Sequence, residues 1–141
     1  MHPTRSETLL RRALSANAAF SGLCGILCVV AASSIAQLTG LPKAEVFAFG
    51  VNLEVFAALL IFLVTRRDLS RGWARALVMA VIAMDVLWVI GSAAILLTAS
   101  PLTTAGKWIV FAVAAVVGDL AFFQLRGFRG LRRTTTATQP A

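Results

Sequence analysis

The feature that most constrains this chain is a set of four long apolar runs, separated by short segments that carry most of its charge. The runs cover residues 13–38, 44–65, 73–97 and 107–125. Each is close to the roughly 20 residues that an α-helix needs to cross about 30 Å of hydrocarbon. Because backbone polar groups find no partners in lipid, runs of this length are predicted to be helical. The sequence therefore predicts an all-α membrane protein, a four-helix transmembrane bundle built from two hairpins.

The composition favours lipid over water as the surroundings of these runs. Hydrophobic residues make up 59% of the 141 residues and charged residues 13%, against about 45–50% and about 25% in soluble domains. A soluble core of this size has too little interior for so much apolar surface. We assign residues 1–133 to one transmembrane domain and the Thr-rich residues 134–141 to a disordered cytoplasmic tail.

The basic residues predict the orientation. Eleven of the 13 Lys and Arg residues flank one side of the runs, whereas the loops on the other side contain only Lys43 and Lys107. This bias predicts a multi-pass protein of the cell (inner) membrane with both termini in the cytoplasm. Since the charge lies in loops and not on a soluble face, we expect no nucleic-acid partner. The basic segment after the fourth run is expected to contact the anionic headgroups of the inner leaflet through Arg126, Arg129, Arg132 and Arg133.

Three acidic residues lie inside the runs. They are Glu54, Asp85 and Asp119, and an acid at the centre of a membrane helix costs about 2.5–3.5 kcal/mol on insertion scales. At about 1.5 Å per residue, they lie roughly 18, 15 and 10 Å from the nearest Arg-rich boundary. All three therefore fall in one layer between the middle of the membrane and its inner surface, where we expect them to face the interior.

Helical periodicity places other polar or small side chains beside these acids. Asp85 shares a stripe with Trp88 and Ser92, and the indole N–H of Trp88 needs a partner such as Asp85. On the other runs, small residues let helices approach closely; those on the faces of Glu54 and Asp119 are Gly50, Ala57, Ala58, Ala112 and Ala115. With Asn17 from a polar stripe on the first run, the candidate intramembrane proton, cation or packing site comprises Glu54, Asp85, Asp119, Asn17, Trp88 and Ser92.

The chemistry of this site is open at the level of sequence. No Lys, Arg or His lies at the same depth, so the acids are protonated and hydrogen-bonded between helices, solvated by a cavity, or bound to a proton, a cation or a partner. His2 is the only histidine, so we expect no metal and no cofactor. No nucleophile–base pair is visible, and the chain is not expected to be an enzyme.

The overall pattern resembles the uncharacterised small four-helix integral membrane proteins of bacteria. The residues that carry this resemblance are 14–18 (LSANA), 40–42 (GLP), 85–92 (DVLWVIGS) and the Arg-rich end. It covers most of the chain, but its motifs are low in specificity and it implies no activity.

Two functions follow from these observations. The first is a non-enzymatic accessory or structural subunit, or a helix-bundle binding module, in a homo-oligomer or a larger membrane complex. The alternative is a small proton- or cation-coupled transporter or channel that uses the intramembrane carboxylates.

Overall fold

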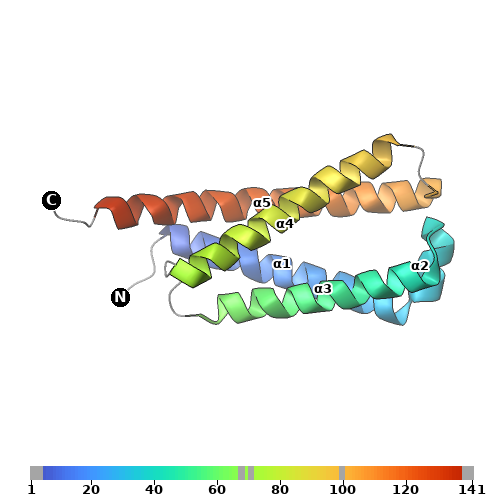
Figure 1. Cartoon of the computed structure of the whole chain (residues 1–141), viewed down its shortest axis with the longest axis horizontal. Helices are drawn as coiled ribbons and strands as arrows, with labels where there is room; N and C mark the ends of the chain where they lie inside the picture. The colour runs from blue at the N-terminus through green and yellow to red at the C-terminus, as the bar shows by residue number, and fades with distance from the viewer. Residues whose placement is uncertain (1–4, 67–68, 70–71, 99–100, 138–141) are drawn as a thin grey trace.

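The computed structural model describes residues 5–66, 69, 72–98 and 101–137, with side chains placed as far as residue 130. These residues form five helices and no strand: α1 (Arg5–Val30), α2 (Ala32–Thr39), α3 (Lys43–Val64), α4 (Gly72–Leu97) and α5 (Thr104–Ala137) (Figure 1). Four segments are long and apolar enough to cross a membrane, namely α1, α3, α4 and residues Thr104–Gly130 of α5. The prediction of an all-α chain with four membrane-length helices is confirmed.

The first predicted run contains two helices. The direction changes at Ala31, but the backbone ladder continues, because Ala31 N–H donates to Leu27 O and Ile35 N–H donates to Ala31 O. Helix α2 then ends at Gly40, which has φ 82°. Only glycine adopts this left-handed conformation without steric cost, so Gly40 terminates the helix.

The last predicted run is longer than expected. Helix α5 continues past Leu125 to Ala137, so residues 134–137, which we expected to be disordered, are helical. No proline interrupts the chain between Leu102 and Gln139, and Leu and Arg are good helix formers. Residues 138–141 lie outside the described part of the chain.

Close packing of α1 against its neighbours depends on glycines. A Cβ atom added at Gly50 would lie 2.9 Å from the carbonyl oxygen of Gly25, so α1 and α3 approach each other backbone to backbone. A Cβ atom added at Gly127 would likewise lie 2.9 Å from the backbone nitrogen of Leu10, which brings α1 against α5. For helices that lie in lipid, where no hydrophobic force drives association, close van der Waals contact of this kind is one of the main sources of helix–helix attraction.

Polar contacts secure both ends of the helices. Where α1 begins, Arg11 Nη1 donates to the carbonyl oxygen of Val64 at 2.8 Å, a group that the end of α3 leaves without an intrahelical partner. At the opposite end, Thr103 N–H donates to Thr39 O at 3.0 Å, and Gly106 N–H donates to Thr103 Oγ1 at 2.9 Å as an N-cap of α5. The start of α1 and the end of α5 lie at the same end of the molecule (Figure 1).

The apolar core lies toward the end at which Arg5, Arg11, Arg66 and Arg126 are found, which we call the Arg-rich end. Its buried residues come from α1, α3, α4, α5 and the loop before α4, and are Leu10, Leu14, Ala18, Leu60, Leu63, Leu69, Val78, Val81, Ile82 and Phe128. This core leads directly into the layer that contains Asp85.

Candidate functional site

Asp85 is the centre of a buried polar cluster that joins three helices. Its side chain is 4% exposed, and its Oδ2 atom accepts hydrogen bonds from Asn17 Nδ2 at 2.7 Å and from Gln124 Nε2 at 3.0 Å. Asn17 belongs to α1, Asp85 to α4 and Gln124 to α5. One carboxyl oxygen therefore ties α1 and α5 to α4.

A fourth side chain extends this cluster along α1. Ser21 Oγ donates to Asn17 Oδ1 at 3.2 Å, and the i, i+4 spacing brings the two onto one face. Asn17 and Gln124 are 0% exposed, so their amides have no access to solvent or lipid headgroups. We call Asn17, Ser21, Asp85 and Gln124 the Asp85 cluster.

The donors around Asp85 are neutral, and two buried oxygens nearby lack a partner. Gln124 Oε1 and Ser92 Oγ have no hydrogen-bond partner within the described residues, although both side chains are buried. The predicted stripe thus brings Ser92 inside without bonding it to Asp85. Among the described residues, no three His, Cys, Asp or Glu side chains come together as they would around a metal ion.

Trp88 does not serve as the partner of Asp85 that we expected. Its ring stacks on Phe49 of α3, with ring centroids 5.0 Å apart and an interplanar angle of 22°. The two donors to Asp85 are amides from other helices. Trp88 lies one turn from Asp85 on the same helix, but its ring packs on α3, whereas the donors to Asp85 come from α1 and α5.

Glu54 occupies a separate position between α1 and α3. A Cβ atom at Gly25 would collide with Glu54 Oε1, and would lie 3.0 Å from its Cδ. Gly25 therefore makes room for the carboxyl group. Glu54 is half-buried, and its Oε1 atom is buried with no hydrogen-bond partner among the described residues. No hydrogen bond links it to the Asp85 cluster.

Asp119 lies on the exposed side of α5. Ala112 and Ala115, on the same face, are exposed as well. Within the part of the chain that the structure describes, no hydrogen bond or ion pair reaches Asp119. Of the three acids that we placed in one layer, the structure therefore buries Asp85, half-buries Glu54 and exposes Asp119.

The structure also corrects the rotation of α3 and adds a residue that sequence reasoning missed. Gly50 and Ala57 are buried as predicted, whereas Ala58 is exposed. Gln124 was not predicted because it carries no charge, although an amide inside an apolar run is itself a signal for an interhelical hydrogen bond. Arg126 and Arg129 are exposed at the Arg-rich end, while the side chains of Arg132 and Arg133 lie outside the described part.

Comparison with known proteins adds no assignment. No protein-family model, curated protein or solved structure matches this chain. What the fold defines is an all-helical protein whose four long apolar helices are compatible with an integral, multi-pass membrane protein.

Proposed function

We propose that this chain is a non-enzymatic integral membrane protein of the cell (inner) membrane, acting as an accessory or structural subunit or as a binding module in a larger membrane assembly. The observation that carries this proposal is the exposure of Asp119. It lies on the lateral surface of α5, seven residues from Arg126, and therefore roughly 10 Å deeper than the Arg-rich boundary.

An acid facing lipid at this depth is energetically unfavourable. Insertion scales assign it about 2.5–3.5 kcal/mol at the centre of a helix, and acids within membrane helices almost always face protein or a water-filled cavity. The other deep acids have places against neighbouring helices of the same chain, Asp85 in its cluster and Glu54 over Gly25. Asp119 has none, so a protein partner in the membrane accounts for it best.

The proposal includes a four-helix bundle with both termini in the cytoplasm, because the basic residues gather at the Arg-rich end. Single cysteines replacing Lys43 and Thr136, in a background from which Cys24 and Cys28 have been removed, are expected to react with membrane-impermeant maleimide from opposite sides. The Lys43→Cys variant should be labelled in intact spheroplasts, and the Thr136→Cys variant only after lysis. Labelling of position 136 from outside would contradict the proposed orientation.

The subunit role is tested by the size of the native particle. Tagged chain at its native level, extracted in a mild detergent or in polymer nanodiscs, is expected to migrate in a native gel well above the mass of one 14.9 kDa chain with its lipid belt. Cross-linking in intact membranes before extraction controls for loss of the partner. A monomer in both experiments would overturn the proposal.

The alternative, a proton- or cation-coupled carrier, is favoured by one observation. Gln124 Oε1 and Ser92 Oγ are buried without partners, and such atoms are suited to receive water or an ion. In proteoliposomes, uptake driven by a proton or sodium gradient that is present in the wild type and absent in Asp85→Asn would support this alternative over the subunit.

A further inference from the structure

We infer that the exposed face of α5 docks a transmembrane helix of another protein, and that this helix carries a Lys or Arg side chain at the depth of Asp119. This inference rests on the proposed subunit function and names the partner's chemistry. The face is a stripe that we call the α5 seam, and it consists of Trp108, Ala112, Ala115, Asp119, Phe122 and Arg126.

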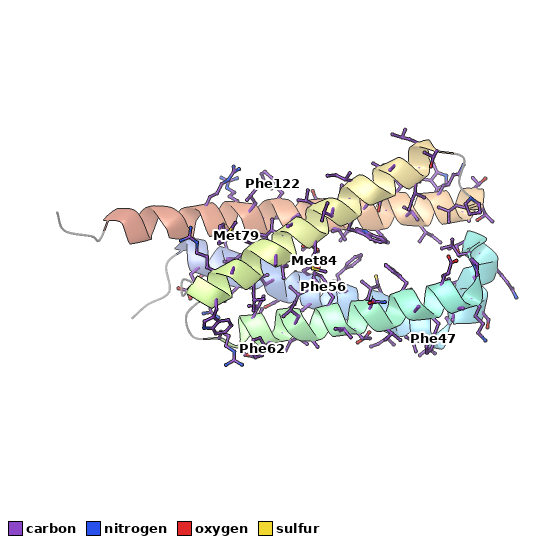
Figure 2. The ribbon with its side chains drawn as sticks, viewed as in Figure 1. Phe47, Phe56, Phe62, Met79, Met84 and Phe122 are labelled. Atoms are coloured by element: carbon purple, nitrogen blue, oxygen red, sulfur yellow. The ribbon has the colours of Figure 1, made fainter. Side chains whose placement is uncertain are left out.

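The spacing of the α5 seam is that of a helix–helix contact. Its members follow one another at alternating intervals of four and three residues, the heptad pattern that keeps one side of a helix facing a partner helix. All six are exposed in the monomer. Figure 2 shows Phe122 on the side of α5 that faces away from α3. Over an apolar 18-residue stretch of each candidate span, the share of buried residues is also smallest in α5, 17% against 33% in α1.

The inward stripe of α5 is already occupied, which leaves the α5 seam as a second, separate face. Val117, Ala121, Gln124 and Phe128 are buried against the rest of the chain. The seam lies on the opposite side and places two alanines next to Asp119, between Trp108 and Phe122. Small side chains at such a position let a second backbone approach closely.

Charge decides which helix fits. Asp119 is an acidic side chain without a partner in the described chain, so the complementary group is a basic side chain at the same depth. A second copy in the same orientation, paired through the same seam, would place Asp119 against Asp119 and Arg126 against Arg126. Like charges at equivalent positions oppose such pairing. The occupant we propose is therefore a different helix, with a basic residue opposite Asp119.

The test uses the full-length chain in liposomes with defined probe helices. One probe is a Leu-rich 21-residue transmembrane peptide with a single Lys about 10 Å from its cytoplasmic end, and the other is the same peptide with Leu in place of Lys. Energy transfer between labelled chain and labelled peptide should show about tenfold tighter association of the Lys peptide. Asp119→Leu should abolish this preference, and Asp119→Asn should reduce it.

Asn52→Leu is the matched control, because Asn52 is another exposed polar residue in a candidate span. Unlike Asp119, it already has a partner, since its Nδ2 atom donates to Ala48 O within its own helix. It should leave the Lys preference unchanged. Equal association of the two peptides, or a Lys preference that survives Asp119→Leu, would overturn the inference. Self-association of the chain that depends on Asp119 would overturn it in favour of a second copy.

The same variants separate this inference from the proposed function. If the native particle remains large when Asp119 is replaced by Leu, the subunit role stands and the α5 seam is not its docking face. If the wild-type chain is monomeric in native membranes, the proposed function fails irrespective of peptide binding. If the large native particle falls to monomer with Asp119→Leu but not with Asn52→Leu, both are supported.

Discussion

Replacement of Asp85 by alanine is expected to lower the free energy of unfolding by about 2–4 kcal/mol, the largest stability effect that we expect for a single polar residue of this chain. Two amides, Asn17 Nδ2 and Gln124 Nε2, would lose their acceptor at positions where both side chains are 0% exposed. Each buried donor left without a partner costs about 1–3 kcal/mol, and the lower half of the combined range applies because hydrogen bonds between membrane helices are modest. Reversible unfolding in bicelles measures this directly.

Two variants bracket the Asp85 result. Asp85→Asn retains an oxygen acceptor at the same place and should lower the free energy of unfolding by no more than about 1 kcal/mol. Asp119→Ala removes an acid of the same type from an exposed position and should leave the free energy of unfolding of the isolated chain unchanged or slightly higher. If Asp85→Ala were as stable as Asp119→Ala, the Asp85 cluster would not hold the helices together.

Replacement of Gly127 by alanine is the second large effect, and should lower the free energy of unfolding by about 1–3 kcal/mol through overpacking. The new Cβ would lie 2.9 Å from both Cβ and N of Leu10 and 3.0 Å from its Cα. Because most of these atoms are backbone or attached to it, relief requires α1 and α5 to move apart. The same unfolding measurement, together with the helix separation from paired spin labels, tests this expectation.

Gly118→Ala is the matched control on the same helix. The added Cβ atom would have Val89 Cγ2 as its nearest neighbour, at an ordinary 3.8 Å. Only the gain in helix propensity therefore remains, which is worth up to about 1 kcal/mol.

The Asp85 cluster also links α1 to α5. The double variant Gly127→Ala with Asp85→Ala should therefore lose less free energy of unfolding than the sum of the losses in the two single variants. Full additivity would show that the two contacts between these helices act independently.

Most of the secondary structure could be predicted from the sequence because it depends on local properties. Length and apolarity of the runs, with the need to satisfy backbone hydrogen bonds, are enough to predict helices of membrane length. The end of α2 at Gly40 follows from the turn signal at Gly40 and Pro42. The inward position of Asp85 also follows from sequence, since its face continues to Ser92, which is buried too.

The rotation of the helices could not be read from the sequence, and only the tertiary structure decided it. Helix α5 offers two faces with small or polar residues, one at Ala115 and Asp119 and the other at Ala121 and Gln124. The structure buries the second and exposes the first. In lipid, an outward face is as apolar as an inward one, so hydrophobic periodicity does not distinguish them. Close approach at Gly25 and at Gly127 fixes the rotation instead, because a residue without a Cβ atom lets two helix backbones come closer than any other residue does. What the sequence determined was thus the helices and the positions of polar groups along them, whereas backbone packing determined which of those groups are buried and which are exposed.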